Sequence, residues 1–463
     1  MKNLFEDKKK LFIVLMGIGM FAGFSNFMEP ANLLVMSSIA ISLMVIVFGN
    51  DMSTLYLILA LCPFYNSLNL NGVSAGFVIP FLASVKLVIN NMKSGLSPYF
   101  IASIVFLLVW FIHDIQYRTY ASTLISLFVP CYVFLFISMK NFDNYDGYYA
   151  MWIVICSSLI AMVSVFLVQG GSLDAFLQAS YSGEMRLGEA DTDAGEKNQL
   201  DGAMGFPIYT LTVITLLLQM LMTRRYTFVV KLLFGVIMIG LLFITFLTVS
   251  RVYLLGLATL VLLLCFHVLK RRSLSTIMGG SLIFIFILVV SSDYLGGYLE
   301  VISSQYQGRM DIDGGNSGLG VRGTIYQDCI SYLSENYECL LIGKGNGAYP
   351  LIGAELHRPM SQSAHNMILD ALMSFGALGS MFVASIYFKA YKKENSRLGI
   401  KWTVFRIIPF ACVFIMYQTA SPFLLDKTYP FLLFLVLNII HCTDDSPYDP
   451  KWATDNGFNV QKI

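Results

Sequence analysis

The sequence predicts an all-α polytopic membrane protein with about fourteen transmembrane helices, because segments of about 20 apolar residues recur along the chain. Of its 463 residues, 56% are hydrophobic and only 13% are charged, whereas soluble proteins carry about 25% charged residues. With a mean hydropathy of +0.68, the chain has too little polar surface to face water. Lipid must therefore surround most of it.

The expected spans follow from helix geometry, since about 20 residues rising about 1.5 Å each cross a hydrocarbon core about 30 Å thick. They lie at residues 11–28, 31–48, 52–68, 74–91, 97–113, 121–139, 148–168, 204–222, 228–249, 252–269, 274–292, 363–388, 403–421 and 424–441. The count ranges from twelve to fourteen. Cys62-Pro63 interrupts the third span, only Ser250-Arg251 separates the ninth from the tenth, and the last span is marginal.

The basic residues predict the orientation of the spans. Lys and Arg gather in alternate short loops, at Arg224-Arg225, at Lys270-Arg271-Arg272 and over residues 389–401, and cytoplasmic loops carry such an excess. The start Lys8-Lys9-Lys10 runs into an apolar segment with no small-residue cleavage site after it, which predicts a retained anchor. We therefore expect a single membrane domain over residues 1–463 in a bacterial inner membrane, with both termini cytoplasmic.

Two long polar segments then face outward, and we expect them to be periplasmic loops. The first, 169–203, is acidic, and the larger, 293–362, contains a Gly- and Asp-rich stretch. Within the larger loop, apolar residues at Val321, Ile325, Ile330 and Leu333 predict an amphipathic helix over 319–341. Loops of this length in a compact protein are usually functional or disordered. The remaining polar segment, 442–463, is expected to be a cytoplasmic tail.

Composition argues against several functional classes. The formal net charge is +1, and no basic stretch with interleaved aromatics suggests nucleic-acid binding. The eight cysteines form no CxxC motif or Cys/His cluster, so the sequence predicts no metal site. Cys329 and Cys339 share the large outer loop, and a disulfide between them is left open. In one continuous helix they would stand about 15 Å apart, too far to bridge.

Arg251 is the first candidate site residue, because it is a lone cation between two apolar runs at the outer face. An arginine deep in a membrane costs at least about 2.5–3.5 kcal/mol. It is either a turn residue that snorkels to the headgroups or an anion ligand. A guanidinium suits bidentate contact with phosphate oxygens and keeps its charge.

Two further patches lie on the outer side. Arg322 precedes, by about twenty residues, the run Gly343-Lys344-Gly345-Asn346-Gly347, which is either a flexible turn or a place where backbone approaches a ligand closely. His365 opens the twelfth span, with Asp370 about 7.5 Å deeper and Asn366 on the same helix face as Asp370. His365 is either an interfacial anchor and helix cap or a general base, and an intramembrane Asp is a functional-site candidate.

In this order, the three patches resemble the bacterial O-antigen polymerase and O-antigen ligase families. The resemblance covers residues 248–379 and rests on Ser250-Arg251, Arg322, Gly343/Gly345/Gly347, His365-Asn366 and Gly376-Ala377-Leu378-Gly379. Those families often carry a Glu two residues before the last glycine pair, where this chain has Ser374, although Asp370 could take its place. The resemblance implies an all-helical membrane glycosyltransferase of the GT-C-like class that uses no nucleotide sugar, no metal and no cofactor.

The resemblance also implies a substrate and roles. The donor would be a glycan on undecaprenyl diphosphate in membrane lipid, and the acceptor a hydroxyl of another lipid-linked repeat unit, with a polysaccharide chain-length regulator as an expected partner. Arg251 and Arg322 would hold the diphosphate and His365 would act as base. The substrate-binding set would be Ser250, Lys344, Gly345, Asn366 and Asp370.

Three functions remain as alternatives. A polymerase is favoured because two large outer loops suit two glycan substrates, and an O-antigen ligase that transfers the glycan to a lipid A-core acceptor shares the same motifs. A flippase or transporter is the non-enzyme alternative. The span interiors carry almost no charge apart from Lys86 and Asp370, and no internal repeat relates the two halves, which argues weakly against a transporter.

Overall fold

The computed structural model describes residues 5–25, 31–64, 67–70, 73–91, 144–168, 202–223, 226–246, 251–270, 319–345 and 366–398, besides a few single positions. These stretches are helical except for one two-stranded hairpin and short connections. The expected spans 97–113, 121–139, 274–292, 403–421 and 424–441, the loop 169–203 and the tail 442–463 lie outside the described residues, apart from single positions.

Three helices within the described residues are long and apolar enough to cross a membrane, at Ala31–Phe48, Asp146–Val168 and Phe228–Thr245. Shorter apolar helices lie at Asp51–Phe64, Val78–Asn90, Phe206–Leu221, Tyr253–Leu264 and Ile368–Phe382. The protein is thus a multi-pass membrane protein whose described part is almost wholly helical.

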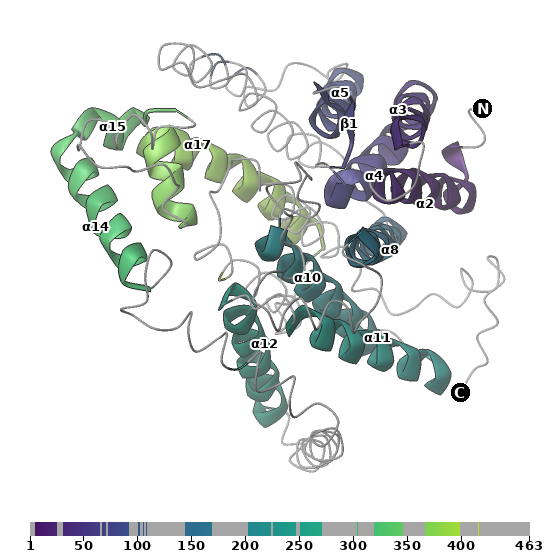
Figure 1. The fold of residues 1–463 in the computed structure, drawn as a ribbon. Coiled ribbons are helices and arrows are strands. Elements are labelled where there is room, and N and C mark those ends of the chain that lie inside the picture. Colours follow the sequence, from purple (N-terminus) through teal and green to yellow (C-terminus); the bar gives the residue numbers. More distant parts are fainter. Residues whose placement is uncertain are drawn as a thin grey trace.

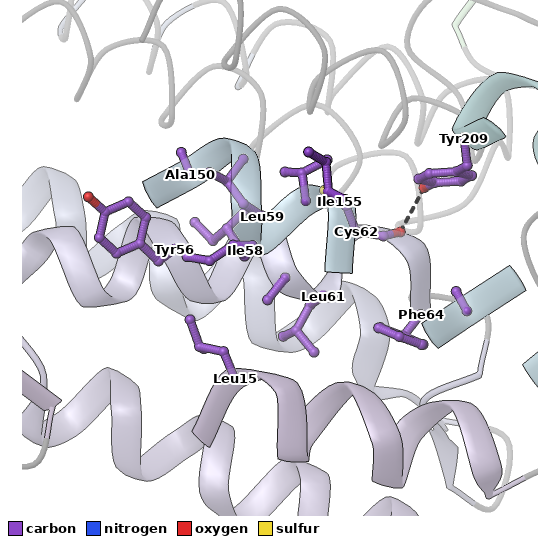
Figure 2. Close-up of a cluster of buried hydrophobic side chains, with 14 of the residues drawn as sticks. Leu15, Tyr56, Ile58, Leu59, Leu61, Cys62, Phe64, Ala150, Ile155 and Tyr209 are labelled. Carbon is purple, nitrogen blue, oxygen red and sulfur yellow. Dashed lines mark hydrogen bonds between the residues drawn. The ribbon is translucent and has the colours of Figure 1, made fainter. Parts of the chain in front are cut away.

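The N-terminal helices form a bundle around α4, and all of its residues from Ser53 to Leu61 are buried. The members are α2 (Lys8–Phe24), α3 (Ala31–Phe48), α4 (Asp51–Leu61), α5 (Ala75–Asn91) and α8 (Asn144–Val168). Figure 2 shows Leu15 of α2 and Ala150 and Ile155 of α8 packed around α4. Small residues allow the close approach, because Gly19 and Gly23 of α2 lie against the Phe64 ring.

The third expected span, 52–68, is shorter than predicted. Helix α4 ends at Leu61 and is followed by a 3₁₀ turn over Cys62–Phe64, since Pro63 lacks a backbone N–H and its ring does not fit a continuing helix. Tyr209 of α10 donates to the Cys62 carbonyl at 2.9 Å (Figure 2). A hairpin of β1 (Asn69–Leu70) and β2 (Val73–Ser74) then leads into α5.

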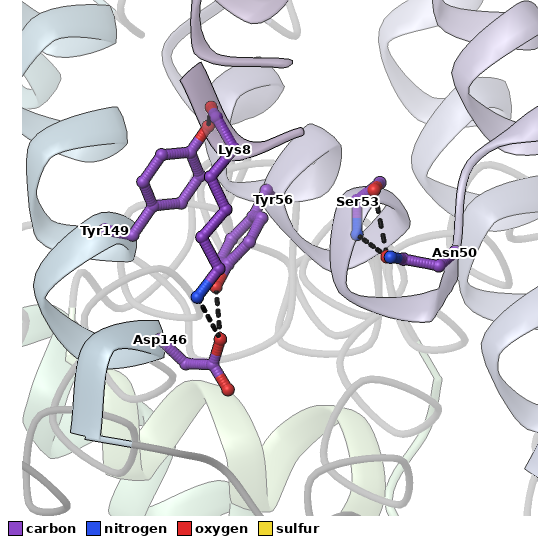
Figure 3. Close-up of polar contacts among 6 residues, drawn as sticks. All are labelled: Lys8, Asn50, Ser53, Tyr56, Asp146 and Tyr149. Carbon is purple, nitrogen blue, oxygen red and sulfur yellow. Dashed lines mark hydrogen bonds and ion pairs between the residues drawn. The ribbon is translucent and has the colours of Figure 1, made fainter. Parts of the chain in front are cut away.

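Polar contacts align the helix ends of the bundle. Asp146 Oδ1 accepts from Tyr56 Oη at 2.8 Å and from Lys8 Nζ at 3.3 Å (Figure 3). Ser53 Oγ, in the first turn of α4, donates to the Phe5 carbonyl at 2.6 Å, so the N-terminal ends of α2, α4 and α8 lie on one side. Lys86, late in α5, donates to the carbonyls of Ile46 and Gly49, where α3 ends. Helices α3 and α5 therefore run opposite to α2, α4 and α8, which is the alternation expected of consecutive spans.

A second group contains α10 (Gly202–Thr223), α11 (Phe228–Phe246) and α12 (Arg251–Lys270), drawn in teal in Figure 1. The Tyr253 hydroxyl, near the start of α12, donates to the Leu242 carbonyl near the end of α11 at 3.1 Å. The end of α11 and the start of α12 therefore lie close together, and the ninth and tenth expected spans are separate helices.

The third group holds α14 (Leu319–Glu335), α15 (Tyr337–Ile342) and α17 (Met367–Leu398), which appear in green at one side of the molecule in Figure 1. The predicted amphipathic helix over 319–341 is present but breaks at Asn336, which lies outside helical geometry with φ −117° and ψ 80°. Helix α17 extends ten residues beyond the expected span 363–388, into a polar stretch.

Candidate functional site

The three helices of the third group share a small core of their own. Its fully buried members are Cys329, Tyr332, Leu333, Cys339 and Met373. The first three lie on α14, Cys339 lies on α15 and Met373 lies on α17. These helices therefore fold as one unit, which we call the outer unit, and the described site residues on it are held relative to one another.

The start of α17 is fixed by Asn366. Its Oδ1 accepts from the backbone N–H of Ile368 at 3.0 Å and of Leu369 at 3.1 Å, which is the hydrogen bonding of an N-cap. Its own carbonyl accepts from Asp370 N at 2.9 Å. The capping role considered for His365 therefore belongs to Asn366, and His365 itself lies outside the described residues.

Helix α17 breaks at Gly376, where φ is 64° and ψ is −176°. A break releases carbonyls from the helical ladder, and buried carbonyls require new donors. The backbone N–H of Lys344 donates to Met373 O at 2.8 Å, and that of Gly345 donates to Ser374 O at 2.9 Å. The Gly-Lys-Gly turn is thus joined to the break in α17 by two main-chain hydrogen bonds, an arrangement that we call the clasp.

Two glycines make the clasp possible, because Gly343 faces the backbone of α17 and Gly376 faces the backbone at the end of α15. A Cβ on Gly343 would lie closer than 3.0 Å to the Ser374 carbonyl and to Phe375 N, and one on Gly376 would lie as close to Leu341 and Ile342 backbone. Gly343 has φ 82° and ψ 178°, so both glycines also occupy a conformation that essentially only glycine adopts. A side chain at either position is therefore excluded both by contact with the facing backbone and by the backbone conformation.

Lys344 and Asp370 lie against α14. The Lys344 Nζ stands 5.0 Å from the centre of the Tyr332 ring, a cation–π distance, so the ammonium is held beside α14. Asp370, one turn after the start of α17, is 1% exposed. The Asp370 carboxylate also raises the pKa of a thiol on α14. Burial first, and then the negative charges of Asp370 and Asp328, raise the pKa of the Cys329 thiol to about 12.

The two cysteines of the outer unit are thiols in the structure, and both are buried. The helix break at Asn336 removes the single-helix geometry that would have kept them about 15 Å apart. Within the described residues, no group of three or more His, Cys, Asp or Glu side chains is arranged to hold a metal ion.

The remaining site residues are distributed as follows. Arg322 lies in the first turn of α14 and therefore on the outer unit, together with Lys344, Gly345, Asn366 and Asp370. Arg251 is the first residue of α12, and Ser250 lies outside the described residues. Sequence reasoning missed that Gly343 meets Gly376 and that Tyr332 lies under Lys344. The two glycine motifs are separate in the sequence, and no local pattern predicts that they lie in contact.

Comparison with known proteins agrees with this picture. Residues 234–384 match the family model described as O-antigen ligase, a stretch that includes α12, α14, α15, the larger part of α17 and each candidate residue from Ser250 to Asp370. No curated protein matches the chain. Through residues 234–384 the chain therefore carries the O-antigen ligase family domain, which O-antigen polymerases and O-antigen ligases share.

Proposed function

We propose that the protein is a polymerase that joins undecaprenyl-diphosphate-linked repeat units into a surface polysaccharide at the outer face of a bacterial inner membrane. The family domain implies transfer of lipid-linked glycans. The observation that carries the proposal is the outer unit, because it joins Arg322, Lys344 and the helix start at Asn366 in one folded piece next to a span. About fourteen spans, with periplasmic loops at 169–203 and 293–362 and both termini cytoplasmic, complete the proposed topology.

In the proposed reaction, an acceptor hydroxyl oxygen forms a bond to the anomeric carbon of the donor glycan. The bond from that carbon to the diphosphate oxygen breaks, and undecaprenyl diphosphate leaves with the electron pair. His365 accepts the hydroxyl proton, which suits an imidazole with an ordinary pKa of about 6.5. Arg251 and Arg322 stabilise the charge that develops on the leaving diphosphate, and Lys344 adds a cation beside them.

The remaining residues would orient the substrates. Asn366 and Asp370 would position the acceptor below His365, Gly345 would let the backbone approach the donor, and Ser250 would support Arg251. Because two guanidinium groups and an ammonium offset the diphosphate charge, the proposed mechanism requires neither a metal nor a nucleotide sugar.

Substitution of the proposed base and anion ligands tests the proposal. In a strain that depends on this protein, His365→Ala is expected to lower polymer formation by about 10²–10⁴-fold, the usual contribution of a general base. Arg251→Ala and Arg322→Ala should each cost about 10²–10³-fold, as for lost transition-state donors. Protein level in the membrane should stay unchanged. His267→Ala, at the far end of α12, is the matched control, and full-length polymer from the three variants would refute the assignment.

An O-antigen ligase is the second candidate, favoured by the description of the matching family. A deletion strain separates the two, because loss of a polymerase leaves single repeat units on the final acceptor, whereas loss of a ligase leaves none. Glycan transfer by the purified protein in vesicles that already hold both substrates in the accessible leaflet would exclude a flippase, since no substrate then needs to cross.

A further inference from the structure

One face of α15 is apolar and uncovered, although the helix lies in the expected periplasmic loop 293–362. Tyr337 is 72% exposed and Leu341 is 51% exposed, and residues four apart share one side of a helix. The outward side of the preceding helix is mostly polar, because Gln327, Ser331, Ser334 and Glu335 of α14 are exposed, although Ile330 on the same side is 57% exposed. The exposed surface is therefore more apolar on α15 than on α14.

The clasp sets the depth of α15. Its last residues and the Gly-Lys-Gly turn pack against residues 373–376 of α17. The apolar part of α17 after the break runs only from Ala377 to Phe388 before Lys389 begins a basic stretch. About twelve residues span about 18 Å, which is short of a hydrocarbon core of about 30 Å. The residues before the break must therefore lie in the membrane as well, and α15 is attached to them.

The backbone at the end of α15 and at the break in α17 is suited to a position within the membrane. Irregular backbone at membrane depth is tolerated only where protein satisfies its polar groups. The carbonyls of Met373 and Ser374 are satisfied by the clasp, and Gly343 N donates to Cys339 O at 2.8 Å at the end of α15. The exposed side chains of α17 itself, Leu378 at 57% and Met381 at 66%, extend the apolar surface beyond the clasp.

We infer that residues 337–345 form a re-entrant segment whose apolar face lies in the outer leaflet of the bilayer. Tyr337 and the exposed Glu338 lie at headgroup level, where aromatic rings concentrate, and Leu341 and Ile342 reach the acyl chains. The polar face of α14 stays in water. The occupant of the apolar face is thus membrane lipid, and the inference does not depend on the reaction proposed above.

Spin-label accessibility tests this placement in the full-length chain. Leu341→Cys is labelled with a nitroxide in detergent and reconstituted into phospholipid vesicles, with Met381→Cys as the lipid-facing reference and Ser334→Cys as the water-facing one. Collision with oxygen, which partitions into lipid, is compared with collision with a water-soluble nickel chelate. The label at 341 is expected to match 381, with oxygen dominant, whereas the label at 334 is expected to favour the nickel chelate.

Two outcomes would overturn the inference. Dominant collision with nickel at 341 would place the face in water, and weak collision with both reagents would mean that protein, including a second copy of the chain, covers it. Leu341→Trp offers an independent measurement if the spin-labelled chain is unstable. Its fluorescence should be quenched by lipids brominated on the acyl chains, and that of Ser334→Trp should not, after subtraction of the signal from the unmodified chain. Neither measurement requires glycan transfer, so failure of the proposed function would leave both readouts intact.

Discussion

At the scale of single residues, the outer unit shows how one side chain can serve both folding and chemistry. Asn366 uses Oδ1 to cap α17, and a substrate role would involve its amide nitrogen. Asp370 is buried among α14 neighbours, where its charge reaches Cys329. Asn366 therefore contributes to the stability of the unit whatever it does to a substrate.

The two roles of Asn366 can be separated by substitution. Asn366→Ala removes the cap and should lower the free energy of unfolding by about 1 kcal/mol. Asn366→Asp keeps an accepting oxygen, so thermal unfolding in detergent should stay close to that of the unmodified chain. If the amide nitrogen binds substrate, Asn366→Asp will lose glycan transfer despite this stability. Equal transfer by Asn366→Asp and the unmodified chain would assign the residue to capping alone.

The raised pKa of Cys329 predicts slow alkylation. The thiolate is the reactive form, and with a pKa of about 12 only about one thiol in 10⁴ is ionised at pH 8. Maleimide or iodoacetamide should therefore modify Cys329 at least about 10³-fold more slowly than Ser334→Cys, an exposed site on the same helix, with an ordinary pKa of about 8.5. Peptide mass spectrometry gives both rates in one sample.

The pH dependence of the alkylation rate shows the direction in which the pKa of Cys329 is shifted. The rate at Cys329 should still rise about tenfold per pH unit between pH 9 and 11, where the rate at an ordinary thiol has levelled off. Similar rates and similar pH profiles at the two positions would contradict the buried, negatively charged environment.

At the scale of elements, the clasp is the feature that joins the turn after α15 to α17. Hydropathy predicted the bounds of several helices closely. The observed helices Ala31–Phe48, Ala75–Asn91 and Arg251–Lys270 correspond to the expected spans 31–48, 74–91 and 252–269. The agreement is close because polar residues lie at both ends of each apolar run. The same method could not detect the break at Gly376, since a backbone break does not alter the average polarity of a window. The pairing of Gly343 with Gly376 needs tertiary structure, which no local pattern contains.

Alanine at either clasp glycine should disrupt the outer unit. Gly343→Ala and Gly376→Ala each force a disallowed conformation that costs about 1–3 kcal/mol, besides the contact with facing backbone. We expect loss of glycan transfer and faster alkylation of Cys339, which packs in the shared core, without faster alkylation of Cys62 in the N-terminal bundle.

The control for the clasp is Gly323→Ala in α14, where an added Cβ meets no atom within 4 Å. It should keep both transfer and thiol protection, since alanine favours a helix over glycine. Wild-type protection of Cys339 in both clasp variants would show that the two backbones separate without consequence for the fold of the outer unit.

At the scale of the whole molecule, the described helices divide into the N-terminal bundle, the α10–α12 group and the outer unit. The alternation of helix directions within the bundle was predicted by the spacing of the apolar segments. The contact that aligns three helix ends was not, because Lys8, Tyr56 and Asp146 are far apart in sequence and none belongs to a motif. Helix α8 also begins four residues before the predicted 148, since Asp146 is buried by this contact.

Removal of the Asp146 carboxylate should destabilise the bundle. Asp146→Ala leaves the hydroxyl of Tyr56, a residue that is 1% exposed, without the oxygen that it donates to, and such a loss costs about 1–3 kcal/mol. Tyr56→Phe should cost less, and the double variant should be more stable than the sum of the two losses implies, because the interaction is lost only once. Thermal unfolding in detergent measures all three, and strictly additive losses would show that the two groups do not interact.

The clasp also has a consequence for biosynthesis. Its two halves leave the ribosome in order, with the turn at 343–345 emerging before the carbonyls of Met373 and Ser374 that it must bind. In the proposed topology, α14 and α15 are exported, and the clasp forms only after the following hydrophobic helix has reached the bilayer. On that topology, integration of α17 into the membrane precedes the closing of the clasp and permits it.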